Sequence, residues 1–90
     1  MKMSNEQRMY IHGQQRADFK PGDKVKVVRK AQDYQAGWGN VWAEKMDDAV
    51  GQIGEVIEPY SEWKDLEGIT VGIEELMNFE YPYFVLEKVE

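Results

Sequence analysis

The 90-residue chain contains no cysteine. Disulfide bonds, thiolate zinc sites and cysteine nucleophiles are therefore excluded together, and a reducing compartment suits such a sequence. Histidine is almost absent too. His12 is the only one, and no Cys, Asp or second His stands near it at the spacing of a metal site. We expect His12 to be a solvated side chain and the protein to need no metal or other cofactor.

Serine and threonine are equally scarce, with only Ser4, Ser61 and Thr70 in the chain. None of them has a plausible base, because the sole histidine lies in the polar N-terminal segment. Carboxylates are plentiful, but the adjacent pairs at 47–48 and 74–75 point in different directions. Acid–base catalysis needs facing carboxylates about 5 to 10 Å apart. We therefore expect no enzyme activity.

Long apolar runs are also missing. No stretch approaches the roughly 18 residues that cross a bilayer, and residues 1–16 lack the apolar centre of a secretory signal. With 42% hydrophobic residues the chain is nevertheless too apolar to be disordered throughout, and its length suits one domain with a modest core. We expect a cytoplasmic protein that has no membrane segment.

Charge is unevenly distributed along the chain, although its sum is −6. Residues 1–30 carry eight Lys or Arg against three acids, a net of +5, and residues 31–90 carry three Lys against fourteen acids, a net of −11. This split opposes wrapping of nucleic acid around the domain, because phosphate binding needs a basic surface. A local basic strip remains, and it could bind nucleic acid or an acidic peptide. We favour the alternative that it is a solvated strand face that discourages edge-to-edge pairing of sheets. Its members are Lys24, Lys26, Arg29 and Lys30.

The stretch 37–58 predicts a turn, a short helix and a strand in succession. Glycines at 37 and 39 flank Trp38 and favour a tight turn. Asn40 is a good helix N-cap, Trp42 begins an apolar face with helical spacing, and Gly51 stands where a helix commonly ends. We expect Trp42 to be the core anchor of this helix. The strand that follows has β-branched residues at Ile53, Val56 and Ile57.

Alternation of polar and apolar residues predicts the other strands. Inward positions fall at Val25 and Val27 in the first strand, and every second residue of 68–73 is apolar in the third. Short strands follow over 79–81 and 86–89, separated by Pro82 and a tight turn. We predict an all-β domain over residues 18–90, a small five-stranded barrel with one short helix.

Residues 1–17 are polar and show only weak helical periodicity. We expect a flexible N-terminal arm over this segment. A short helix from Asn5 to His12 that docks on a partner is the alternative.

Four motifs in order resemble the SH3-like repeat of the mind-bomb family of ubiquitin ligases, over about residues 19–89. They are Gly22-Asp23-x-Val25-x-Val27, Gly37-x-Gly39, Trp42-Ala43-Glu44-x-Met46 and Gly51-x-x-Gly54-x-Val56. The first and last also occur in KOW-type domains and in nitrile hydratase β-subunits. The chain is similar as well to standalone SH3-like proteins of bacteria and their phages. The resemblance implies an SH3-like barrel that binds short protein segments. Ligase activity is not implied, because a RING requires cysteines.

Several aromatic residues fall in or beside the predicted loops, where they can bind a Pro-rich or extended peptide. The candidate partner-binding residues are Trp38, Tyr60, Trp63, Tyr81 and Tyr83. We predict a non-catalytic SH3-like interaction module for a protein or peptide partner, basic in view of the acidic C-terminal part. Two alternatives are a KOW-like nucleic-acid or ribosome-associated barrel and an acidic decoy that inhibits a nucleic-acid-binding protein.

Overall fold

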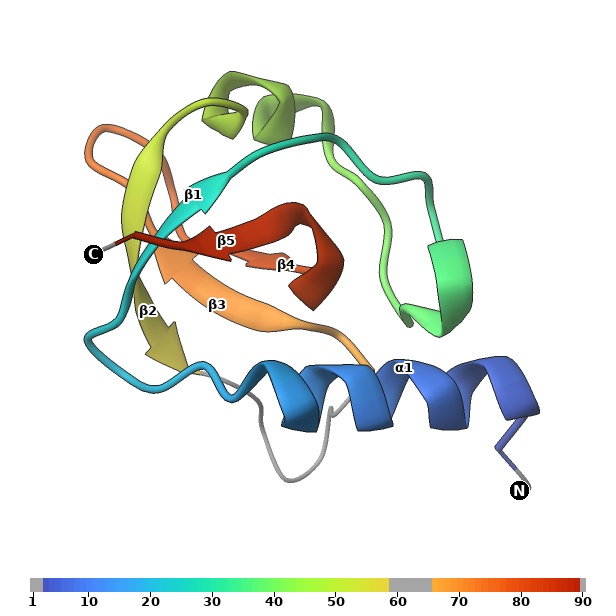
Figure 1. The fold of residues 1–90 in the computed structure, drawn as a ribbon. Helices are drawn as coiled ribbons and strands as arrows, with labels where there is room; N and C mark the ends of the chain where they lie inside the picture. The colour runs from blue at the N-terminus through green and yellow to red at the C-terminus, as the bar shows by residue number, and fades with distance from the viewer. Residues whose placement is uncertain (1–2, 59–65, 90) are drawn as a thin grey trace.

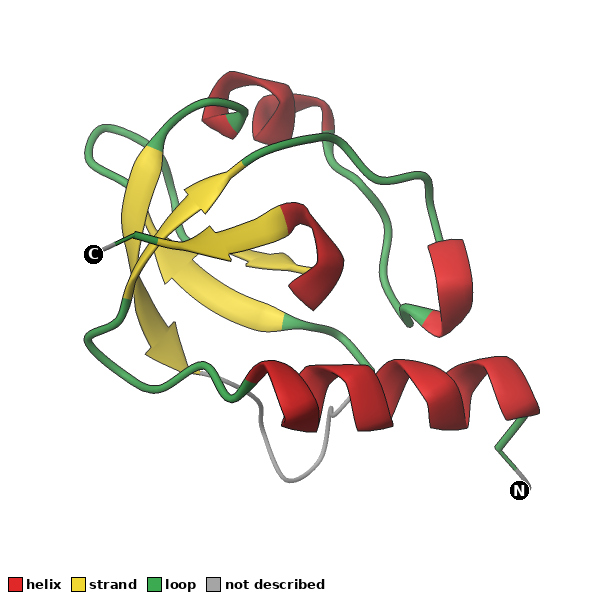
Figure 2. Ribbon diagram, in the orientation of Figure 1, coloured by secondary structure: helices red, strands yellow, loops and turns green. Residues whose placement is uncertain are grey.

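The computed structural model describes residues 3–58 and 66–89, and it shows a twisted sheet with an α-helix along one side (Figure 1). The regular elements are α1 (Asn5–Ala17), β1 (Lys24–Val27), β2 (Ile53–Glu58), β3 (Ile69–Gly72), β4 (Phe79–Tyr81) and β5 (Leu86–Lys88). Three short 3-10 helices, drawn in red with α1 in Figure 2, are η1 (Gln35–Gly37), η2 (Glu44–Ala49) and η3 (Tyr83–Val85). None of the described helices has the length and apolar character that crossing a membrane requires.

The sheet is antiparallel, with the strand order β4-β3-β2-β1-β5. Val25 lies opposite Gly54 and Val56 opposite Val71, and a register shift after Val56 marks an irregularity in β2. Such bulges bend a strand and increase its twist. The prediction of five short strands is confirmed.

The alternation seen in the sequence sets which strand residues enter the core. Val25 and Val27 of β1 and Ile69 and Val71 of β3 are fully buried, whereas the residues between them face outward. Successive side chains of a strand point to opposite faces, so one apolar set covers the inside of the sheet. The inward positions predicted for these two strands are confirmed.

The prediction of a flexible arm is wrong for residues 5–17, which form α1. Ser4 begins the helix with a capping box, in which its side chain accepts from the Gln7 amide and the Gln7 side chain accepts from the Ser4 amide. The inner face of α1 buries Tyr10 and Gln14 and packs against the core. Because a glutamine, Gln14, occupies a core-facing position, hydrophobic periodicity alone understates this face.

The helix predicted after Asn40 begins later and is a 3-10 helix, η2. The Asn40 side chain accepts from the next amide, that of Val41, rather than from one a turn ahead. Asp33 accepts from the Trp42 amide at 2.8 Å and Ala43 has an extended backbone, so the helix begins only at Glu44. The N-cap assignment of Asn40 is therefore wrong. Met46 of η2 is nevertheless buried in the core, as its place on the predicted apolar face requires.

The tryptophan that anchors the core is Trp38, not Trp42. Gly37 adopts a φ of +89°, which glycine tolerates. The side chain of the following Trp38 turns inward and is only 1% exposed. The Trp38 indole donates to the Glu67 carbonyl at 2.7 Å. Trp42 is only partly buried and packs on the edge of the core.

We expect Trp38→Ala to lower the free energy of unfolding by about 3 to 5 kcal/mol, because it empties a buried site and removes the hydrogen bond from the indole to the Glu67 carbonyl. Trp42→Ala, the matched control, removes a partly exposed ring and should cost less. Urea unfolding of the two variants gives the comparison. A larger loss at Trp42 would contradict the assignment of Trp38 as the core anchor.

Candidate functional site

The structure separates the five aromatic residues that the sequence grouped as a binding surface. Trp38 is 1% exposed and Tyr81 is 0% exposed, so neither ring lies on an accessible loop and that expectation is wrong for both. Tyr81 points into the core from β4, opposite Ile69 of β3. Tyr60 and Trp63 lie outside the described residues. Among the predicted residues that the structure describes, Tyr83 is the one that is partly exposed.

Tyr83 belongs to a group of three rings that we call the η3 aromatic cluster: Tyr83 and Phe84 of η3 with Tyr10 of α1. The Tyr83 and Phe84 ring centroids are 5.5 Å apart and nearly perpendicular. Tyr10 lies 5.2 Å from Tyr83 and 6.3 Å from Phe84. Edge-to-face and tilted pairs at these distances are favourable for aromatic rings. The cluster therefore joins α1 to the end of the sheet.

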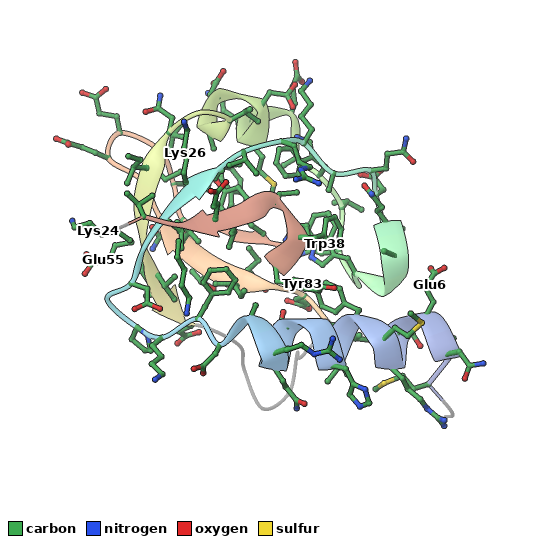
Figure 3. All side chains as sticks on the ribbon, in the orientation of Figure 1. Glu6, Lys24, Lys26, Trp38, Glu55 and Tyr83 are labelled. Carbon is green, nitrogen blue, oxygen red and sulfur yellow. The ribbon has the colours of Figure 1, made fainter. Side chains whose placement is uncertain are left out.

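The local sequence explains why η3 presents its rings in this way. Pro82 is extended and precedes a single 3-10 turn, closed by the Val85 amide donating to the Pro82 carbonyl at 3.2 Å. Val85 is fully buried and pins the turn to the core. The two preceding aromatic residues remain partly exposed, and Figure 3 shows Tyr83 on the side of the sheet that faces α1. One buried valine thus fixes where both rings lie.

The Tyr10 hydroxyl is a buried polar group with partners on both sides. It donates to Gln14 Oε1 at 2.9 Å and forms a hydrogen bond with the Tyr83 backbone. Burial raises the pKa of Tyr10 above its usual range against the opposing effect of that backbone hydrogen bond, and electrostatic repulsion from the Glu80 carboxylate raises it further. Glu80 of β4 therefore places a carboxylate within electrostatic reach of the cluster.

Sequence analysis missed Tyr10 and Phe84 as members of this cluster. The signal for Tyr10 is the i, i+4 pair that it forms with Gln14, flanked by Ile11 and Ala17, which also pack on the core. Phe84 was assigned only to a turn, and nothing in its spacing distinguishes it from a core residue.

A second polar arrangement connects η2 to the end of β1. Asp47 accepts from the Trp42 indole at 2.7 Å and forms an ion pair with Lys30 at 3.1 Å. The hydrogen bond from Trp42 and then that from Lys30 hold the pKa of Asp47 below its usual value. The arrangement ties three segments of chain together at the surface.

The basic strip is interleaved with acids. Lys24 lies opposite Glu55 and Lys26 opposite Glu87 in the strand register, and Figure 3 shows Lys24 next to Glu55. Lys30 is paired with Asp47, as described above. These neighbours favour a solvated strand face over a phosphate-binding strip. The lysines do not guard a sheet edge, however, because β1 lies between β2 and β5.

No group of three or more His, Cys, Asp or Glu side chains is placed to hold a metal ion within residues 3–58 and 66–89. Comparison of the chain with protein-family models, with curated proteins and with solved structures found no significant match. The η3 aromatic cluster is thus the candidate site that the geometry itself offers.

We expect acid to weaken the fold partly through Asp47. Its folded-state pKa is lowered from 3.8, so its contribution is present above about pH 4 and is lost as the pH falls through the lower folded-state pKa. Urea midpoints measured from pH 7 to pH 2 should fall less steeply for Asp47→Asn than for the wild type. Asp48→Asn, which alters the exposed neighbour, serves as the control. An unchanged acid profile for Asp47→Asn would contradict this role.

Proposed function

We propose that this chain is a non-catalytic, SH3-like interaction module that binds an extended protein segment at the η3 aromatic cluster. Two features of the fold support the architecture: the antiparallel order β4-β3-β2-β1-β5 and the 3-10 turn that leads into β5. Five short antiparallel strands are what we expect of the SH3-like barrel that the sequence resemblance implies. In the proposed module, a turn rather than a strand contributes the binding surface.

The observation that carries the proposal is the partial exposure of two adjacent aromatic rings on a turn pinned by Val85. Tyr83 and Phe84 stand edge to face at the surface, while the turn that holds them is anchored in the core. Rigid aromatic side chains provide a large contact area at low entropic cost, which is why they dominate binding hot spots. A peptide that lies across these rings buries apolar surface without any rearrangement of the sheet.

Charge favours a partner segment that contains lysine or arginine. The chain carries a net charge of −6, and Glu80 is within electrostatic reach of the cluster. A cationic side chain placed over an aromatic face gains a cation–π interaction, and a nearby carboxylate strengthens the preference. The partly exposed rings then provide affinity, and Glu80 together with the net negative charge of the chain provides selection.

The proposal is tested with peptide arrays that contain lysine- and arginine-rich sequences and their acidic counterparts, followed by affinity measurements with the full chain. We expect selection of basic peptides and about tenfold weaker binding by Phe84→Ala. Tyr34→Ala is the matched control, because Tyr34 is 63% exposed but does not belong to the cluster. Circular dichroism confirms that each variant is folded.

Salt dependence distinguishes the nucleic-acid alternative. Peptide binding should weaken only moderately as salt is raised, because contact with the aromatic rings is not screened, whereas duplex DNA or RNA would dissociate with a steep, linear log–log dependence. Equal peptide binding by the wild type and Phe84→Ala, or tight salt-sensitive binding of nucleic acid, would overturn the proposed function.

A further inference from the structure

Helix α1 covers part of the surface to which we assign binding. Tyr10 is 1% exposed because it lies against Tyr83 and Phe84, and the Tyr83 backbone is hydrogen-bonded to its hydroxyl. Figure 3 shows Trp38 and Tyr83 between the sheet and α1. An aromatic residue of the chain itself thus occupies the place where a partner's side chain would stack.

The docked helix fits closely at two glycines. A Cβ on Gly13 would overlap the Tyr83 ring and hydroxyl, and a Cβ on Gly37 would overlap the Glu6 carbonyl. Glycine at these two points lets the helix backbone approach η1 and η3 more closely than any other residue allows. The docked position is therefore specific, and it is sensitive to a single methyl group.

Residues 18–23 connect α1 to β1, and the first of them, Asp18, has a hinge-like backbone conformation. Asp18 has φ 52° and ψ 49°, in the left-handed region that non-glycine residues seldom adopt. Phe19 is buried directly after it, and Lys88 of β5 donates to the Asp18 carbonyl at 2.9 Å and lies 5.5 Å from the Phe19 ring centroid. The chain is thus fixed to the sheet from Phe19 onward, and α1 is attached through Asp18.

Two properties of α1 lower the cost of undocking it. Its N-terminus is capped by its own Ser4 and Gln7, so this stabilisation does not depend on the sheet. Its buried face includes the Tyr10 hydroxyl and Gln14, polar groups that regain water when they are exposed. Segments held by such contacts open more readily than central strands do.

We propose that α1 is an intramolecular strap: it turns away from the sheet about Asp18, withdraws Tyr10 from the η3 aromatic cluster and so uncovers the Tyr83 and Phe84 rings for the peptide partner. This inference rests on the proposed function, because the partner and Tyr10 compete for the same two rings. The apparent peptide affinity is then the intrinsic affinity multiplied by the fraction of molecules in which the strap is open.

Native-state amide hydrogen exchange tests the opening without any partner. We expect the α1 amides and the Tyr83 amide to exchange together, faster than the amides of the central strand β2. Gly13→Ala should accelerate exchange in α1 by about tenfold through the clash with Tyr83, although alanine is the better helix former. His12→Ala, the control on the exposed face, should cause no acceleration. Tyr10→Phe is a second loosening variant, because it removes the buried hydrogen bond from the hydroxyl to Gln14, which stabilises the docked helix.

Peptide affinity then tests the competition. We expect Gly13→Ala and Tyr10→Phe to bind the selected basic peptides several-fold more tightly than the wild type or His12→Ala. Exchange of α1 and β2 at the same rate would overturn the strap, as would separate opening that leaves peptide affinity unchanged. Failure of every variant to bind peptides would instead overturn the proposed function, and the regulatory role with it, whatever the exchange rates show.

Discussion

The inward turn of Trp38 is the constraint on which much of the remaining structure depends. Its indole donates to the Glu67 carbonyl, and the neighbouring Gly39 amide donates to the Leu66 carbonyl at 2.6 Å. Together these bonds tie the long segment between β1 and β2 to the start of β3. The glycine turn before Trp38 also lies against the first turn of α1. Core, loop and helix therefore meet around one buried side chain.

The same arrangement leaves the molecule with two different surfaces. Toward α1 the contacts are aromatic and include buried hydrogen bonds, whereas the outer face of β1 and β2 carries lysines interleaved with acids. Figure 3 places Lys24 and Glu55 at the opposite end of the view from Glu6. A strand face of mixed charge is solvated at little cost, while a polar helix interface is stable only when its groups are paired. The aromatic side is thus where competition between helix and partner has energetic consequences.

An element could be predicted from the sequence when the interactions that determine it act between residues close together in the chain. The strands at 24–27 and 69–72 depend on alternation, which acts between near neighbours and is visible in the chain. The boundary of η2 depends on Asp33, nine residues before the Trp42 amide that it holds. The inner face of α1 was hidden because Gln14 is buried there and is hydrogen-bonded to Tyr10. Hydrophobic patterning has no means of recognising a buried glutamine.

For the candidate site, the sequence by itself determined that aromatic residues follow Pro82 in a tight turn and that the chain as a whole is acidic. Only the tertiary structure decided which rings are accessible: Trp38 and Tyr81 turn into the core, whereas Tyr83 stays partly exposed and lies against α1. The physical reason is that ring exposure depends on backbone turns and on contacts between distant segments. Tyr10 and Tyr83 are 73 positions apart in the chain, yet their rings are 5.2 Å apart.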